Sequence, residues 1–371
     1  MSDSIDVAGA EKVLLSLLQR INREKYQIYA VTPEAGLLSQ EFNKLNIPCY
    51  HVKMNFKIHS LRYFRHFKVF IELIKITKQH DIDLVYCNRA IVGKYGSLLK
   101  IFFGVACIWH LHDFFEHFPG DRLGRFASVM IAVSHAVRNS YPILYRPLIQ
   151  VVYNGTDFET LQDSTTILTD IRTELKINSS VQIVTLIARL TAWKGQRLFV
   201  EAAAKILRKI NNVKFLIVGD VIRSQQQTKD KNFKLEMLEL QKKLGLHEDV
   251  YFLGWRKDIF SIIAKSDIIV NSSIEPEPLG TTILEGMALG KPIVCTPSGG
   301  NSEMVLDGIN GIVIKEFNAE QLAGAIETLL NNPELALKMG NAGKKRLKNH
   351  FSMESFVKQI ETIIDNTLHK V

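Results

Sequence analysis

Residues 268–300 read IIVNSSIEPEPLGTTILEGMALGKPIVCTPSGG, and this stretch decides the fold class. A short apolar run at 268–270 opens into a polar loop, a helical stretch begins near Gly280 and Thr281, and another apolar run follows at 293–295. A strand, a loop, a helix and a second strand in this order form the repeating unit of a parallel sheet covered by helices. Ligands bind at the carboxyl edge of such sheets, so the loop before Gly280 is a candidate site.

The same alternation of apolar runs and amphipathic helical stretches continues along most of the 371 residues. Before residue 157 the expected strands are 27–32, 48–52, 84–87, 106–109, 129–133 and 150–152, with helices at 11–20, 37–44, 61–78 and 92–102. The pattern then starts again, with strands at 183–187, 213–218, 250–252, 268–270, 293–295 and 312–314. Because the chain is too long for one ordinary core, the sequence predicts an α/β protein of two doubly wound, Rossmann-like domains facing across a cleft.

The expected domain boundaries follow from this pattern. Residues 1–157 form the first Rossmann-like domain, and the polar segment 157–169 forms the linker. Residues 158–350 form the second Rossmann-like domain, which contains the 268–300 stretch. Residues 351–371 form a helix that crosses back toward the first domain.

The first domain begins unusually. A doubly wound domain starts with a central strand that feeds a glycine-containing turn and a helix, yet only residues 1–5 precede the turn at 6–11. The first strand is therefore expected to be missing. Either the true start of the protein lies upstream, which we favour, or residues 1–5 form a stunted substitute.

Composition excludes several classes of protein. Hydrophobic residues make up 46% of the chain and charged residues 23%, as in ordinary globular proteins. No stretch approaches the roughly 20 consecutive apolar residues of a membrane-spanning helix. The four cysteines are scattered without a CxxC motif, and the N-terminus lacks the pattern of a secretion signal. These features predict a cytoplasmic protein.

A basic segment lies in the first domain. Residues 53–78 contain seven Lys or Arg residues and one acidic residue, Glu72. Positions 61, 64, 67, 71 and 74 are apolar, which predicts an amphipathic helix with a cationic face. Two interpretations stay open: docking on an anionic membrane surface, and a helix that packs on the core with a solvated basic side. Nothing resembles a base-reading module, so no nucleic-acid partner is expected.

The 268–300 stretch contains groups suited to a nucleoside diphosphate sugar. Backbone N–H groups around Leu279, Gly280 and Thr281 form a phosphate site together with the positive end of the helix dipole. Glu277 and Glu285, eight positions apart, supply carboxylates that accept hydrogen bonds from vicinal hydroxyls. The alternative is a pair of solvated glutamates, one of them favoured by the helix dipole.

Several motifs together resemble retaining glycosyltransferase family four, the glycosyl transferases of group 1, whose fold is called GT-B. The pair Glu277 and Glu285 is followed by GMALGKPIV at 286–294 and by GG at 299–300. Further matches are IARLTAWKG at 187–195, VVYNGTD at 151–157, VGD at 218–220, FLGW at 252–255 and AGAE at 8–11. The resemblance implies a hexosyltransferase that moves a sugar, with retention of configuration, from a nucleoside diphosphate sugar to a glycan or lipid-linked acceptor of cell-surface polysaccharide or glycolipid synthesis.

The resemblance also implies roles for residues of the second domain. Arg189 and Lys194 grip the donor diphosphate, because fixed cations stabilise the charge that builds up on the leaving group; surface solvation is the alternative for both. Glu285 accepts hydrogen bonds from the ribose hydroxyls, and Glu277 holds a hydroxyl of the donor sugar.

In the first domain, WHLHD at 109–113 ends an expected strand. His112 aligns with the family's active-site histidine near the donor sugar, with capping of a strand end as the alternative. His110 lies two residues earlier, on the same face of the strand. Gly9 resembles a glycine that lets donor phosphate or acceptor approach the backbone, and Asn154 belongs to the donor-binding positions. Glu11 either orients an acceptor or caps its own helix.

We expect neither a metal nor any other cofactor. A metal would be held by an acidic D-x-D cluster, and the only such triplet, Asp81-Ile82-Asp83, precedes the strand expected at 84–87. That position lies at the edge opposite the ligand side.

Two other functions stay open. One is a nucleotide-sugar epimerase of the same architecture, and the other is an inactive, membrane-associated or partner-binding relative. An NAD-dependent dehydrogenase is disfavoured, because no GxGxxG motif follows any expected strand.

Overall fold

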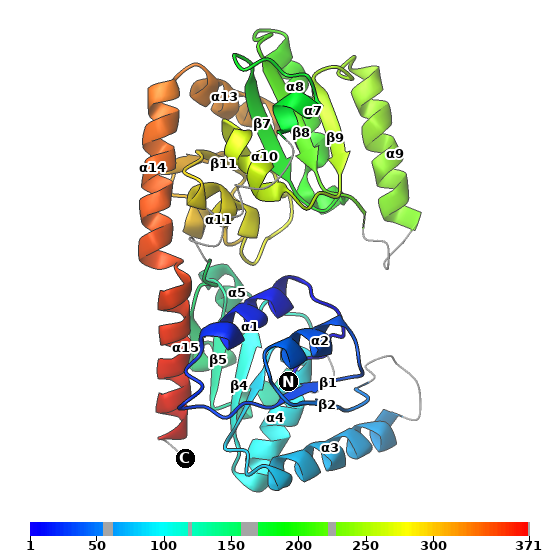
Figure 1. Ribbon diagram of the computed structural model, residues 1–371, viewed down its shortest axis with the longest axis vertical. Helices are drawn as coiled ribbons and strands as arrows, with labels where there is room; N and C mark the ends of the chain where they lie inside the picture. The colour runs from blue at the N-terminus through cyan, green and yellow to red at the C-terminus, as the bar shows by residue number, and fades with distance from the viewer. Residues whose placement is uncertain (55–61, 118–120, 157–169, 222–227, 370–371) are drawn as a thin grey trace. The chain divides into compact units, whose positions relative to one another are not determined.

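The computed structural model describes residues 1–54, 62–117, 121–156, 170–221 and 228–369, with the side chains of 62–65 and 228–231 outside the description (Figure 1). The linker predicted at 157–169 lies outside the described residues. Contacts divide the chain into two compact units. The first comprises Met1–Gly155 with Met353–Val371, and the second comprises Thr156–Ser352.

The first unit contains two parallel sheets. β1 (Ala30–Thr32) pairs with β2 (Cys49–His51), and a separate sheet has the strand order β3-β4-β5-β6. Its strands are β3 (Leu84–Cys87), β4 (Ala106–Leu111), β5 (Val129–Ala132) and β6 (Ile149–Val151). Every residue of β4 is buried, as expected for a parallel strand covered by helices on both faces.

Helices cover both faces of the four-stranded sheet. Ile108 and Ile131 pack with α1 (Gly9–Arg20), α2 (Leu37–Lys44) and α15 (Met353–Leu368). The opposite face, at Cys107 and Trp109, meets α4 (Ala90–Phe103) so closely that a side chain at Gly93 or Gly96 would collide with it. The alternation of side chains along a strand explains this division. The remaining elements of this unit are α3 (Arg62–Gln79), η1 (Asp121–Phe126), α5 (His135–Ser140) and η2 (Ile143–Leu148).

The α3 helix forms where it is expected but buries a different face. Val69 and Leu73 are buried, whereas Phe67 is 60% exposed and Ile71 36% exposed. The expected apolar positions 67 and 71 therefore do not form the core-facing stripe. The helix packs through Val69 and Leu73, each two positions further along. The reason is its neighbour, the end of α4. There the Phe70 ring contacts Phe102 and Phe103 rather than the sheet.

The N-terminal residues form no strand. Met1 and Ser2 make backbone hydrogen bonds to Tyr86 and Val31, and the chain then turns toward α1. The expected first strand is thus absent from 1–5, and the two sheets of this unit remain separate.

The second unit is built on one parallel sheet of order β12-β11-β10-β7-β8-β9. Its strands are β7 (Gln182–Ile187), β8 (Val213–Val218), β9 (Val250–Gly254), β10 (Ile268–Asn271), β11 (Ile293–Cys295) and β12 (Gly311–Val313). Its helices are α7 (Ile171–Glu174), η4 (Ala192–Lys194), α8 (Gln196–Leu207), α9 (Thr228–Lys243), α10 (Ile259–Lys265), α11 (Thr281–Ala288), α12 (Asn301–Met304), α13 (Ala319–Leu330) and α14 (Pro333–His350). The core lies where α8 and α13 pack on β7 and β8.

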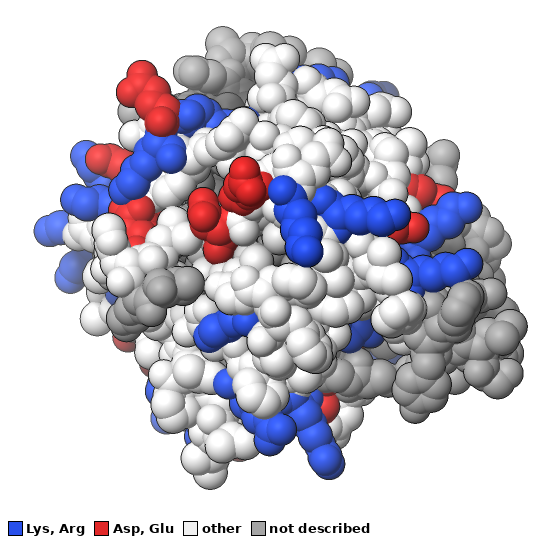
Figure 2. Space-filling model, turned by 90° about the horizontal axis from the view of Figure 1, so that it is seen from below, with Lys and Arg blue, Asp and Glu red and all other residues white. Residues whose placement is uncertain are grey.

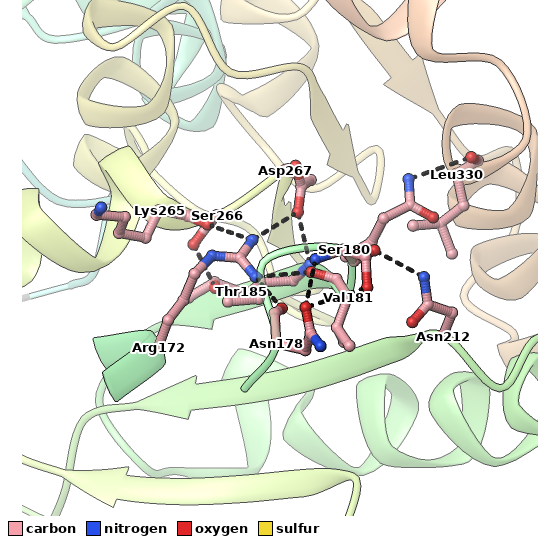
Figure 3. Close-up of polar contacts among 12 residues, drawn as sticks. Arg172, Asn178, Ser180, Val181, Thr185, Asn212, Lys265, Ser266, Asp267 and Leu330 are labelled. Carbon is pink, nitrogen blue, oxygen red and sulfur yellow. Dashed lines mark hydrogen bonds and ion pairs between the residues drawn. The ribbon is translucent and has the colours of Figure 1, made fainter. Parts of the chain in front are cut away.

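A polar network closes the amino edge of this sheet (Figure 3). The Arg172 guanidinium donates to the carbonyls of Asn178, Val181 and Lys265 and pairs with Asp267 at 3.5 Å. Asp267 also accepts the N–H of Ile183 at 2.7 Å. These bonds satisfy the backbone groups that precede β7 and β10, so this edge is occupied by structural contacts. The opposite, carboxyl edge is the one available to a ligand.

The described part of the chain contains no helix that is both long enough and apolar enough to cross a membrane.

Candidate active site

The strand order of the second unit places a switch point between β7 and β10. From β7 the chain continues to β8 on one side, and β10 lies on the other side of β7. Loops that leave adjacent strands in opposite directions open a crevice at the carboxyl ends of those strands, where α/β proteins bind ligands. The predicted residues Arg189 and Lys194 follow β7, and Glu277, Leu279, Gly280 and Thr281 follow β10.

A buried ion pair joins these two loops. Lys194 Nζ contacts Glu277 Oε1, and the two side chains are 15% and 9% exposed. The other carboxylate oxygen of Glu277 accepts from Ser273 Oγ at 2.6 Å and Asn271 Nδ2 at 3.4 Å. Burial lowers the pKa of Lys194, and the attraction of Glu277 offsets part of this effect. A buried charge pair is costly unless it is well hydrogen-bonded, and this pair is held on both oxygens of Glu277.

Two glycines let the loops approach this closely. Gly195 has φ of 71°, and a Cβ there would lie 1.9 Å from the carbonyl oxygen of Ser272. Gly299 has φ of 54°, and a Cβ there would lie 2.2 Å from the carbonyl oxygen of Glu277. A larger residue at Gly195 would push the β7 and β10 loops apart and separate Lys194 from Glu277, and one at Gly299, in the loop after β11, would displace the backbone of Glu277.

Arg189 lies in the same loop as Lys194, and its side chain has a buried donor without a partner among the described residues. Its carbonyl oxygen accepts from Gln196 Nε2 at 2.8 Å, which fixes the backbone. Its guanidinium lies 5.9 Å from the ring centre of Trp193, and Lys194 Nζ lies 4.0 Å from the same ring. Arg189 Nε is buried and has no hydrogen-bond partner among the described residues. Because buried donors are normally paired, this atom marks a place for an acceptor.

The start of α11 adds backbone donors beside these cations. Gly280 is its N-cap and makes no side-chain cap hydrogen bond, so within the described residues the first turn has no side-chain cap. A Cβ at Gly280 would lie only 3.0 Å from Asn271 Nδ2, so the helix start packs directly on the end of β10. Leu279 is buried, Thr281 is exposed, and Glu285 lies half-buried on the second turn of α11. This is the arrangement that binds phosphate at helix N-termini.

The predicted histidine of the first unit lies at the end of β4. The rings of His110 and His112 are 4.0 Å apart, and both residues are buried. Tyr86 Oη lies 2.6 Å from His110 Nδ1, whereas Nε2 of each histidine has no partner among the described residues. Burial lowers the pKa of His110 to about 3. Burial, with the charges of His110 and Arg89, holds the pKa of His112 well below its usual value. Both rings are therefore neutral near pH 7.

Sequence reasoning missed Arg89, which follows β3. It pairs with Glu11 at 3.4 Å and with Asp3 at 3.7 Å, and Glu11 is completely buried. Glu11 also accepts the N–H of Ala8 at 3.3 Å. It therefore caps its own helix, which is one of the two roles expected for it. The signal for Arg89 was a charged residue two positions after the apolar run 84–87. Its charge acts on His112, which connects the ends of β3 and β4.

The other predicted positions of this unit are Gly9, Asn154 and the pair Asp81 and Asp83. Gly9 begins α1, and a Cβ there would meet nothing within 4 Å, so no internal contact of the protein requires glycine. Asn154 is buried, and its Oδ1 has no partner within the described residues. Asp81 and Asp83 lie in the turn that precedes β3, at the amino end of the strand.

Comparisons with known proteins agree with this architecture. The family model described as Glycosyltransferase Family 4 matches residues 7–160, and the model described as Glycosyl transferases group 1 matches residues 169–346. HepE of Anabaena, solved in complex with UDP, superposes with a TM-score of 0.84 at 24% identity over 98% of both chains. The UDP-Gal:alpha-D-GlcNAc-diphosphoundecaprenol alpha-1,3-galactosyltransferase of Escherichia coli is 26% identical over 98% of this chain and 95% of its own. An uncharacterised glycosyltransferase of Methanocaldococcus jannaschii is 24% identical over 93% and 91%.

Two Rossmann-like units, the second with cations and a helix start at its switch point, form the GT-B fold. The two family models together cover most of the chain. The protein belongs to glycosyltransferase family 4, the glycosyl transferases of group 1.

The depressed histidine pKa values predict a loss of stability in acid. Below pH 6.5 the unfolded chain takes up protons on both histidines while the folded chain does not, so the free energy of unfolding falls as the pH falls. Between pH 7 and pH 5 the free energy of unfolding should fall by about 2 kcal/mol less in His110→Gln than in the wild type. Urea unfolding at the two pH values measures this. The control is His117→Gln, because His117 is 86% exposed; an equal pH dependence in wild type and His110→Gln would contradict the buried neutral ring.

Proposed function

We propose that this protein transfers a hexosyl group, with retention of configuration and without a metal ion, from a nucleoside diphosphate sugar to a glycan or lipid-linked acceptor. The observation that carries the proposal is the switch point between β7 and β10. There Arg189 has a buried donor without a partner among the described residues, and Lys194 contacts Glu277 in the loop that leads into α11. A doubly charged diphosphate is the ligand class that matches two cations and a helix N-terminus.

A bound diphosphate would compete with Glu277 for Lys194. In the structure its ammonium group is held by Glu277. A phosphate oxygen placed between Lys194 and Arg189 would receive charge-assisted hydrogen bonds from both. Glu277 keeps its hydrogen bonds from Ser273 and Asn271, and its remaining acceptor capacity is available to a hydroxyl of the donor sugar. Glu285 is assigned to the ribose hydroxyls.

The chemistry assigned to these groups is charge stabilisation rather than nucleophilic attack. The bond from the anomeric carbon to the phosphate oxygen breaks, and a bond to the acceptor oxygen forms on the same face. The acceptor proton passes to the departing phosphate oxygen. Arg189, Lys194 and the backbone N–H groups of Leu279–Thr281 stabilise the charge on the diphosphate, and this role needs neither an enzyme nucleophile nor a metal.

His112 suits a role in positioning the donor sugar. Its pKa is lowered by burial, so at pH 7 the ring is neutral and adds no positive charge. Its Nε2 is the buried atom without a partner among the described residues. A sugar hydroxyl bound there would satisfy this atom.

Proteins similar to this one support the choice of donor. HepE is solved with UDP, and the Escherichia coli relative uses UDP-galactose and a lipid diphosphate acceptor. We propose UDP-sugars as the donors to test first, followed by GDP- and ADP-sugars.

A transfer assay tests the proposal. Labelled UDP-hexoses are incubated with lipid-linked and glycan acceptors in excess chelator, and the product is examined by NMR. We expect transfer with the anomeric configuration of the donor retained and a rate that the chelator leaves unchanged. The His112→Ala variant should lower kcat by roughly 100-fold with a small change in KM, as for loss of one preorganised transition-state contact.

The matched control is His117→Ala, an exposed histidine of the same unit. Wild-type kcat in His112→Ala would contradict the assigned role. Release of an epimerised nucleotide sugar without transfer would support an epimerase instead.

The proposed lipid-linked acceptor gives a reason for the basic segment 53–78, of which residues 55–61 and the side chains of 62–65 lie outside the described part of the chain. Five exposed apolar side chains on α3 and the end of α4 form a surface that we call the α3–α4 apolar surface: Phe67, Ile71, Ile101, Phe102 and Phe103. Lys68, Lys75 and Lys78 lie on α3 beside it, and Lys78 Nζ lies 5.5 Å from the Phe103 ring. Seen from below the view of Figure 1, basic side chains are spread among uncharged surface, with a smaller acidic group (Figure 2). Aromatic and basic side chains together suit an anionic membrane surface, which we propose as a partner.

Vesicle sedimentation tests this docking. Phosphatidylglycerol-containing vesicles should bind the wild-type protein, and the double variant Phe102→Ser, Phe103→Ser should bind roughly tenfold more weakly, the effect of losing about 1.4 kcal/mol of apolar insertion. Leu144→Ser is the matched control, because Leu144 is 70% exposed in the same unit but lies on η2. Equal sedimentation of all three proteins would show that this surface does not bind membranes.

A further inference from the structure

The loop after β7 contains an aromatic ring that contacts both cations of the loop. Trp193 lies on η4, four positions after Arg189 and directly before Lys194. Lys194 Nζ lies 4.0 Å from the centre of the Trp193 ring, and the guanidinium carbon of Arg189 lies 5.9 Å from it. Both distances are within the roughly 6 Å over which the negative face of an indole attracts a cation. One ring therefore attracts both positive charges of the proposed diphosphate site.

This ring is not what packs the loop on the protein core. Leu190 has that part, because it is 1% exposed and belongs to the hydrophobic core around β7 and β8. Trp193 is half-buried and lies outside that core. Its aromatic face is therefore available to charged neighbours, and the contacts with the two cations are its distinguishing feature.

Backbone hydrogen bonds fix the loop on two sides. On one side, the N–H of Leu190 donates to Asp220 O at 3.2 Å, just beyond the end of β8. On the other side, the N–H of Ile274, in the loop after β10, donates to Trp193 O at 2.8 Å. The backbone at both cations is therefore set. Their charged groups lie several rotatable bonds away from it, so each needs a contact of its own to stay in place.

The two charged groups are held differently. Lys194 contacts the carboxylate of Glu277 as well as the ring. Within the described residues, the Arg189 guanidinium makes neither a hydrogen bond nor an ion pair, so the ring is the contact that holds its charge there. Removing the ring would leave Lys194 with Glu277 and would leave the charge of Arg189 without a described partner.

The two cations also repel each other. Burial lowers the pKa of Lys194, Glu277 raises it, and the charge of Arg189 lowers it again. Arg189 is therefore near enough to act on Lys194. Without an attraction that offsets this repulsion, the flexible Arg189 side chain would turn away from Lys194.

We propose that Trp193 is a positioning residue for the donor diphosphate: its ring holds the Arg189 guanidinium in the orientation in which Arg189 and Lys194 bind the same ligand. This inference rests on the proposed function, because it requires a diphosphate at these two cations.

An aromatic ring suits this task better than a carboxylate would. A carboxylate would also hold the two cations, but it would accept their N–H groups and add a charge that repels phosphate. The ring has no net charge and leaves the N–H donors of both side chains available to phosphate oxygens. This explains how Arg189 Nε can be buried without a described partner. Cations fixed in this way stabilise the charge of the leaving diphosphate without first having to move.

Fluorinated tryptophans at position 193 of the full chain test the proposal. Each fluorine withdraws charge from the face of the ring and leaves its shape nearly unchanged. In calorimetric titrations with UDP, Kd should rise with each added fluorine and reach roughly three times the wild-type value with three fluorines. Trp193→Leu, which removes the ring, should raise Kd roughly tenfold. Trp193→Phe keeps an aromatic face and should bind UDP more tightly than Trp193→Leu.

A Kd that stays constant along the fluorine series would overturn the proposal, even if Trp193→Leu binds weakly, because a ring that only packs gives that pattern. Equal Kd in Trp193→Leu and the wild type would overturn it as well. In both cases the wild type still binds UDP, so the proposed function stands. A wild type that binds neither UDP nor GDP nor ADP would contradict the proposed function and this inference together.

Discussion

The buried ion pair between Lys194 and Glu277 is the contact on which the candidate site depends. It joins the loop after β7 to the loop after β10, and these loops belong to the two strands that flank the switch point. Gly195 in the first of these loops and Gly299 in the loop after β11 have left-handed conformations, and each lies against the backbone of the β10 loop. Among the described residues, Arg189 Nε and the first turn of α11 have no side-chain partner, and they belong to the same two loops as this desolvated charge pair. In such surroundings fixed cations act strongly on a phosphate.

Much of the second unit could be predicted from sequence. Its strands are buried on both faces, so each reads as a continuous apolar run, as at 213–218 and 268–270. The positions of Lys194 and Glu277 in loops after such runs were predicted for the same reason. Their direct contact was not, because it depends on which strands are neighbours. Asn271 and Ser273, which hold Glu277, carry no pattern of their own, since single polar residues after a strand are common.

The first unit was harder to predict. The helical periodicity of α3 was correct, but its buried face depends on the end of α4, which no local pattern reports. The absent first strand was visible in the sequence as a missing apolar run. Its consequence was not: only the structure shows that the helices enclose an apolar cavity with two unpaired strand edges. Arg89 was overlooked because a charge after a strand looks like a solvated loop residue until its partners Glu11 and Asp3 are known.

Calorimetric titration of UDP tests most directly whether the switch point binds a nucleoside diphosphate. The comparison is between wild type, Lys194→Met and Lys205→Met, whose lysine forms an exposed pair with Glu320 in the same unit. Loss of Lys194 removes a charge-assisted hydrogen bond and leaves Glu277 to repel the phosphate, so Kd should rise at least tenfold, corresponding to about 1.4 kcal/mol or more. Lys205→Met should bind like wild type. Equal affinity for UDP in Lys194→Met and wild type would contradict the account.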